Sequence, residues 1–146
     1  NYFQACAGLL KPDGKMVIQA ITVADQRYQA ARDSVDFIQR YIFPGGCLPS
    51  VAVMADHIAT DTDMQIVHLR DITHDYATTL AHWRERFMAK LDVVRSMGFS
   101  EEFVRMWEFY LCYCEGGFRE RIISTVQLAF AKPGYRFASA AVGVGE

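Results

Sequence analysis

The beginning of the sequence places a helix, a tight turn and an apolar strand in succession, which limits the chain to folds that mix helices with a sheet. Residues 2–10 have the composition of a short helix, and residues 11–14 (Lys-Pro-Asp-Gly) end it and turn the chain. Residues 16–23 (Met-Val-Ile-Gln-Ala-Ile-Thr-Val) are almost continuously apolar and β-branched, as in a strand covered on both faces of a parallel sheet. This order is typical of the middle of an α/β domain.

The rest of the sequence continues to alternate helical and strand patterns. Asp33 or Ser34 is positioned to cap a helix that runs to about Ile42, and Ser50 to cap a helix over residues 51–59. Because both follow the first strand, we expect them to form a helical insertion over the sheet. Further elements are predicted at residues 64–71 (strand), 74–97 (long helix), 101–115 (helix ended by Gly116-Gly117) and 121–132 (last strand). The pattern predicts an α/β sheet with an antiparallel strand near its edge, followed by a flexible tail at residues 138–146.

Composition narrows the possible functions. A formal net charge of −2 without a basic stripe predicts no nucleic-acid partner. The four cysteines (Cys6, Cys47, Cys112 and Cys114) have no zinc-ligand spacing, so we expect no metal site and reduced packing thiols, as in the cytoplasm. The sequence has no apolar run long enough to span a membrane.

Three segments carry a family resemblance. They are Leu-Leu-Lys-Pro-Asp-Gly at 9–14, Tyr-Ile-Phe-Pro-Gly-Gly-Cys-Leu-Pro-Ser at 41–50, and Asp-Tyr-Ala-Thr-Thr-Leu-Ala-His-Trp at 75–83. In these segments the chain resembles the cyclopropane-fatty-acyl-phospholipid synthases and the mycolic acid cyclopropane synthases. These are S-adenosylmethionine-dependent enzymes of the class I methyltransferase fold. The resemblance extends over residues 1–132.

The resemblance implies that residues 1–146 are the C-terminal portion of a Rossmann-like methyltransferase domain. The chain would hold the fifth strand of a seven-stranded sheet, a helical insertion after it, and the last two strands. S-adenosylmethionine would be bound mainly by the other half of the domain, so no cofactor-binding residue is assigned here, and the fragment alone is expected to be inactive. Its uncovered strand edge leads us to expect a homo-oligomer.

The resemblance also implies a reaction and its site residues. Family members add a methylene group to the cis double bond of an unsaturated phospholipid acyl chain, with a bicarbonate ion as the apparent base. Tyr76 matches the tyrosine that helps to hold this ion, and Ile21 matches a position whose backbone approaches it. Gln19 stands where many members have His, and an amide donates a hydrogen bond but does not titrate. The alternative to a role in the site is ordinary core packing for Tyr76. For Gln19 the alternative is a hydrogen bond to a neighbouring loop.

Aromatic residues of the insertion complete the predicted site. Phe37, Tyr41 and Phe43 are expected to line the acyl-chain pocket, with packing of the insertion on the sheet as the alternative. The expected location is cytoplasmic, peripheral to the inner membrane face. Two other functions stay open: a methyltransferase acting on another lipid or a small amine, and a non-catalytic half-domain that binds lipid or a partner.

Overall fold

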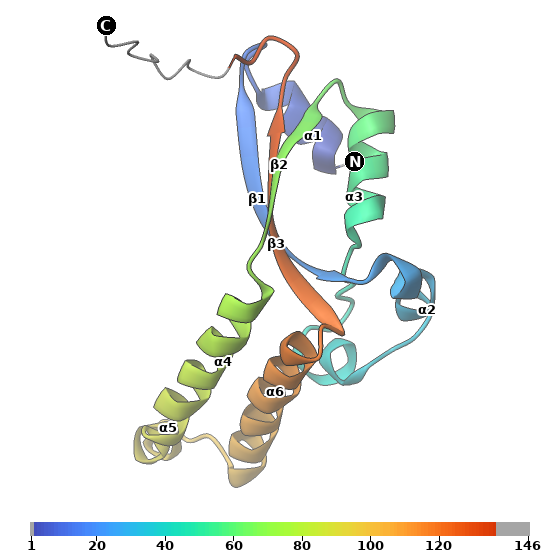
Figure 1. Cartoon of the computed structure of the whole chain (residues 1–146). Helices are drawn as coiled ribbons and strands as arrows, with labels where there is room; N and C mark the ends of the chain where they lie inside the picture. The colour runs from blue at the N-terminus through green and yellow to red at the C-terminus, as the bar shows by residue number, and fades with distance from the viewer. Residues whose placement is uncertain (1, 137–146) are drawn as a thin grey trace, which may run out of the picture.

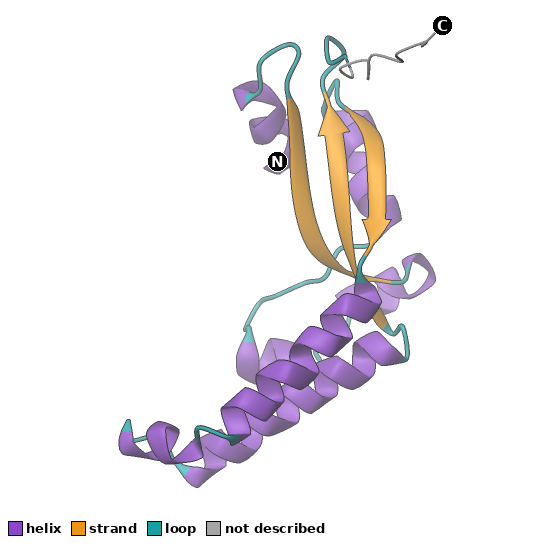
Figure 2. Ribbon diagram, turned by 60° about the vertical axis from the view of Figure 1, so that its left-hand side comes forward, coloured by secondary structure: helices purple, strands orange, loops and turns teal. Residues whose placement is uncertain are grey.

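The computed structural model describes residues 2–136, which form a three-stranded sheet, helices against one of its faces, and a helical hairpin that extends beyond its end (Figures 1 and 2). The elements, in chain order, are α1 (Tyr2–Leu9), β1 (Lys15–Val23), a 3-10 turn (Asp25–Arg27), α2 (Tyr28–Arg32), a π-helical turn (Ile38–Ile42), α3 (Val51–Asp61), β2 (Gln65–Asp71), α4 (Thr73–Met88), α5 (Leu91–Ser96), α6 (Glu101–Arg119) and β3 (Ile123–Ala131). The predicted tail at residues 138–146 lies outside the described residues.

The sheet has the order β1-β3-β2, and β3 runs antiparallel to both neighbours. Lys15 pairs with Ala131 and Val23 with Ile123, so β1 and β3 are in register over their whole length. The prediction of an α/β fold with an antiparallel last strand is confirmed, and within residues 2–136 this strand lies between the other two.

Helices α1 and α3 cover one face of the sheet. Phe130 and Leu128 of β3 are fully buried there, and Phe3 of α1 meets Phe130 edge to face with ring centroids 5.7 Å apart. From α3, Met54 and Ile58 join the same core. Burying each of these large side chains stabilises the fold by about 1.5–3 kcal/mol relative to leaving it exposed.

The opposite face of the sheet meets the helical hairpin only near one end. The hairpin consists of α4, α5 and α6, and its core of Leu80, Leu111 and Phe118 also contacts Ile21 of β1 and Ile123 of β3. Beyond this contact the hairpin projects away from the strands (Figure 2). None of the helices in residues 2–136 is long and apolar enough to cross a membrane.

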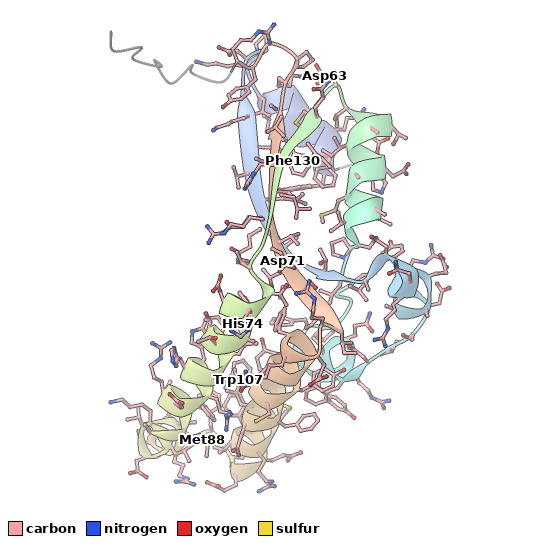
Figure 3. The ribbon with its side chains drawn as sticks, in the orientation of Figure 1. Asp63, Asp71, His74, Met88, Trp107 and Phe130 are labelled. Atoms are coloured by element: carbon pink, nitrogen blue, oxygen red, sulfur yellow. The ribbon has the colours of Figure 1, made fainter. Side chains whose placement is uncertain are left out.

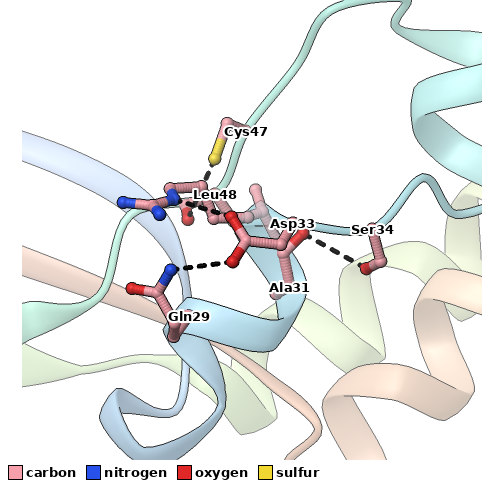
Figure 4. Close-up of polar contacts among 7 residues, drawn as sticks. Gln29, Ala31, Asp33, Ser34, Cys47 and Leu48 are labelled. Atoms are coloured by element: carbon pink, nitrogen blue, oxygen red, sulfur yellow. Dashed lines mark hydrogen bonds and ion pairs between the residues drawn. The ribbon is translucent and has the colours of Figure 1, made fainter.

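Two details of the first strand and its connection differ from the sequence prediction. The apolar run at residues 16–23 is not covered on both faces, since Val17 is 63% exposed and Gln19 is also exposed. Residues 33–42 do not form one capped helix. Asp33 instead ends α2, where its carboxylate accepts hydrogen bonds from Gln29 (2.8 Å) and Arg32 (3.0 Å) (Figure 4).

Two predicted boundaries in the hairpin were also wrong. The helix expected over residues 74–97 breaks after Met88, and α5 starts separately at Leu91. Helix α6 passes through Gly116-Gly117 and ends at Arg119. A Cβ on Gly117 would lie 3.2 Å from the Ile123 side chain, so this glycine allows the helix to approach β3 closely.

Candidate functional site

The candidate site lies where the hairpin meets the sheet. Ile21 of β1 and Tyr76 of α4 pack against the same buried cluster of Ala77, Leu80, Leu111 and Phe118. The structure thus brings together two residues that are 55 positions apart in the sequence. Both were predicted as site residues, and the cluster gives them an apolar surrounding.

Tyr76 is held by other aromatic rings. Its ring lies edge to face with Phe118 at 5.0 Å and with Trp83 at 6.3 Å between centroids. Tyr76 is partly exposed, and its hydroxyl makes no hydrogen bond to another residue in the described part of the chain. The ring is therefore fixed by packing while the hydroxyl is left to bind a ligand or water.

Gln19 lies two residues before Ile21 on β1, and the two side chains share a face of the sheet because side chains alternate along a strand. It pairs directly with Gln127 of β3, whose Nε2 donates to Gln19 Oε1 at 3.1 Å. This bond leaves the Gln19 amide NH2 group as a donor on the exposed face. Gln19 therefore finds its partner on the neighbouring strand rather than in a loop.

An aromatic stripe runs along α6 from the site toward the far end of the hairpin. Its members are Tyr110, Trp107, Phe103 and Phe99, and neighbouring rings lie 4.3–5.6 Å apart. Trp107 occupies the middle of the hairpin (Figure 3). Phe43, a predicted pocket residue, meets Tyr110 edge to face at 6.2 Å and so joins the stripe at its site end.

The other two predicted pocket residues lie elsewhere on α6. Phe37 contacts Phe109 at 4.8 Å and Tyr113 at 5.8 Å, and Tyr41 packs on Phe37 at 5.5 Å. Phe109 and Tyr113 are exposed and do not belong to the cluster around Tyr76. Phe37 and Tyr41 thus attach segment 24–50 to α6, whereas Phe43 reaches the stripe.

Sequence reasoning missed a polar junction between β2 and α4. Asp71 accepts a hydrogen bond from the Thr73 backbone N–H (2.8 Å) and one from Arg121 (2.6 Å). These bonds with Thr73 and Arg121 lower the pKa of Asp71 from 3.8 to about 2. Thr73 Oγ1 in turn accepts from the backbone N–H of Thr125. These bonds fix the start of α4, the helix that carries Tyr76, and Asp71 lies at that start (Figure 3).

A buried hydroxyl, that of Thr125, lies beside the site without a hydrogen-bond partner among residues 2–136. Thr125 is fully buried and pairs directly with Ile21, which places both side chains on the same face of the sheet. Its Oγ1 makes no hydrogen bond within residues 2–136. A buried unsatisfied group of this kind costs about 1–3 kcal/mol, and no sequence signal marks it.

Burial shifts the pKa of two titratable groups of α6 beside the cluster, Cys114 and Tyr110. Burial raises the pKa of Cys114 to about 11, so its thiol is a weak nucleophile. Burial also raises the pKa of Tyr110, with smaller effects from Cys114 and Tyr76. The arrangement offers an apolar surface with hydrogen-bond donors at its edge.

The described residues contain no group of His, Cys, Asp and Glu that is able to hold a metal ion. Their glycines with positive φ, Gly45 and Gly98, do not join a strand to a helix, which is where a glycine-rich cofactor loop lies. Two shallow pockets, of about 210 and 380 Å³, lie away from Tyr76: one near Asp71 and Arg121, the other near Lys132.

Comparisons of the sequence with known proteins all match the same family of enzymes. The sequence model of the mycolic acid cyclopropane synthetase family matches residues 1–128. The chain is 43% identical over 134 residues to the tuberculostearic acid methyltransferase UfaA1 of Mycobacterium tuberculosis, covering 92% of this chain and 31% of that protein. It is 36% identical over 132 residues to the cyclopropane-fatty-acyl-phospholipid synthase of Escherichia coli K12, covering 90% and 33%.

Solved structures agree with the sequence relatives. The mycolic acid cyclopropane synthase CmaA1, solved with SAH and CTAB, superposes with a TM-score of 0.79 at 26% identity, covering 90% of this chain and 48% of that one. The cyclopropane synthase MmaA2 from Mycobacterium tuberculosis gives 0.78 at 25%, with the same coverage. The chain thus spans about a third of the two curated relatives and about half of the two solved structures. Taken with the antiparallel β3 and the helical hairpin, these matches show that the chain belongs to the cyclopropane and mycolic acid synthase family of class I S-adenosylmethionine-dependent methyltransferases.

Proposed function

We propose that this chain forms the acyl-chain-binding part of an enzyme that transfers one carbon from S-adenosylmethionine to the cis double bond of an unsaturated phospholipid acyl chain, closing a cyclopropane ring. The observation that carries the proposal is Tyr76, whose ring is fixed among aromatic side chains while its hydroxyl lacks a partner within the described residues. Family membership supplies the reaction class.

The aromatic residues would bind the alkene and stabilise the charge that develops on it. When bound, S-adenosylmethionine supplies an electrophilic methyl group, and attack by the double bond leaves a positive charge on the acyl chain. Ring faces such as those of Tyr76, Trp107 and Tyr110 attract cations by about 0.5–2 kcal/mol each. A bound acyl chain packed against this cluster would displace the water that would otherwise capture the cation.

Ring closure further requires that a proton leave the transferred methyl group. The chain offers two hydrogen-bond donors on one side of the sheet, the Tyr76 hydroxyl and the Gln19 amide. Two such donors suit an anion that would itself accept the proton. We propose that this anion is bicarbonate. In this arrangement Tyr76 and Gln19 bind and orient the base, and Ile21 packs beneath it.

A second candidate function is formation of a methyl-branched acyl chain. Two observations favour it: the 43% identity with a protein named a tuberculostearic acid methyltransferase, and the presence of Gln19, which is unable to titrate. Both functions begin with the same carbon transfer to a double bond, and they differ in what happens to the cation afterwards. The substrate-binding part of the proposal is therefore common to both.

Transfer of a labelled methyl group from S-adenosylmethionine to lipid, measured in the intact protein, tests the role of Tyr76. We expect Tyr76→Phe to lower kcat at least about tenfold, since a hydrogen bond to a charged group contributes about 1.5–3 kcal/mol. Tyr2→Phe is the matched control, because Tyr2 lies on α1 at the other face of the sheet. Equal rates for the two variants would remove Tyr76 from the proposed site.

A further inference from the structure

The far end of the hairpin exposes apolar side chains. We define the hairpin tip as residues 86–99, which comprise the end of α4, the short helix α5 and the turn into α6. Met88, at the end of the hairpin that is distant from the sheet (Figure 3), is 36% exposed. Val93 (52%), Met97 (68%) and Phe99 (42%) are exposed in the same short segment. Four large apolar side chains on one projecting end form a patch of the kind that marks an interaction site.

Cations outnumber anions in the tip, since residues 86–99 contain Arg86, Lys90 and Arg95 against a single acidic residue, the exposed Asp92. Arg86 and Lys90 are exposed, and neither forms an ion pair within residues 2–136. Arg95 pairs with Glu101 at 2.5 Å and lies 3.7 Å from Asp92. The tip therefore presents Arg86 and Lys90 as unneutralised positive charges beside exposed Met, Val and Phe side chains.

We propose that the hairpin tip is a membrane-binding element, which inserts its apolar side chains into the surface of an anionic phospholipid bilayer. This inference rests on the proposed function, whose substrate is a membrane lipid. Apolar side chains reach about 5–10 Å into the boundary between headgroups and acyl chains, and flanking cations meet the lipid phosphates. Charge complementarity favours this occupant over a second copy of the chain, which would present the same cations to Arg86 and Lys90.

The aromatic stripe connects the tip to the candidate site. Phe99 belongs to both, and from there the stripe continues through Phe103 and Trp107 to Tyr110. At 1.5 Å per residue along α6, the path from Phe103 to Tyr110 is about 10 Å. An acyl chain that leaves the bilayer at the tip would thus follow aromatic rings to Tyr110, which packs against the same buried cluster as Tyr76.

The test measures binding of the intact protein to vesicles by co-sedimentation. Each cation near an anionic surface contributes about 1 kcal/mol, so we expect Arg86→Gln with Lys90→Gln to weaken binding to phosphatidylglycerol vesicles about thirtyfold. We expect Val93→Asp with Met97→Glu to weaken it more than tenfold. Two variants are controls that should bind normally: Met97→Leu, and the charge-preserving pair Arg86→Lys with Lys90→Arg. Circular dichroism checks that every variant is folded.

The outcomes separate the inference from the proposed function. If the tip variants lose vesicle binding and methyl transfer to vesicles but keep transfer to detergent-dispersed lipid, both are supported. If the protein modifies no lipid but its vesicle binding still depends on the tip, only the proposed function fails. Unchanged vesicle binding in both variants would overturn the inference, and a simultaneous loss of dimers in analytical ultracentrifugation would assign the tip to a second copy.

Discussion

Replacing Asp71 by Asn tests the polar junction that fixes the start of α4. Asp71 accepts hydrogen bonds from Thr73 and Arg121, and these lower its pKa from 3.8 to about 2. For a fully buried carboxylate such a shift would correspond to about 2.5 kcal/mol. Because the Asp71 side chain is 40% exposed, solvent screening reduces the expected loss of unfolding free energy to about 1 kcal/mol at pH 7.

The effect of Asp71→Asn on the free energy of unfolding should depend on pH in one direction. A carboxyl group with a lowered pKa in the folded state contributes stability above its unfolded pKa, and the contribution is lost as pH falls through the folded pKa. The difference between the wild type and Asp71→Asn in urea unfolding should therefore be constant above about pH 5 and shrink between about pH 4 and 2. Asp92→Asn is the control, since Asp92 is fully exposed and lies 3.7 Å from Arg95. A difference that persists at pH 2, or equal effects of the two variants at pH 7, would refute the reasoning.

Three further substitutions test the packing and the turns, each by chemical or thermal unfolding. Leu128→Ala should lower the free energy of unfolding by about 2–5 kcal/mol, because Leu128 is fully buried. The control Val35→Ala, at a 75% exposed position, should change it by less than about 0.5 kcal/mol. Similar losses in the two variants would contradict the assignment of Leu128 to the core. Gly134→Ala should cost about 1–3 kcal/mol, since its Cβ would lie 2.5 Å from the Pro12 carbonyl oxygen; an unchanged melting temperature would show that this turn relaxes freely. Ser100→Ala should cost about 1 kcal/mol, because the hydroxyl caps α6 by accepting from the Phe103 N–H; no loss would remove that cap from the account.

Elements with strong periodicity or a capping residue could be predicted from the sequence. Ser50 and Ser100 cap α3 and α6 as expected, and the strand ending at Asp71 is close to its predicted range. The prediction that both faces of residues 16–23 are buried was wrong, because the apolar composition of a strand does not specify what covers it. Within residues 2–136 the hairpin reaches that face only near Ile21.

The site could be predicted only in part. The position of Tyr76 beside Ile21 depends on the packing of α4 against β1, which local sequence does not encode, and family resemblance indicated it instead. Asp71 accepts a local hydrogen bond from Thr73 and a second one from Arg121. Arg121 is 50 positions away in the sequence, and no spacing rule predicts such a bond. The pair Gly116-Gly117 predicts a helix end, whereas in the structure Gly117 allows α6 to pack closely against the side chain of Ile123.

Lipid mass spectrometry tests the central claim most directly. The intact protein is incubated with S-adenosylmethionine and vesicles of unsaturated phosphatidylglycerol, and the acyl chains are then analysed. We predict chains that gain one CH2 and lose the double bond without gaining further hydrogen, and we predict much less of this product with Tyr76→Phe. A methyl-branched product would favour the second candidate function. Unmodified lipid in the presence of bound cofactor would contradict the assignment of an acyl-chain substrate.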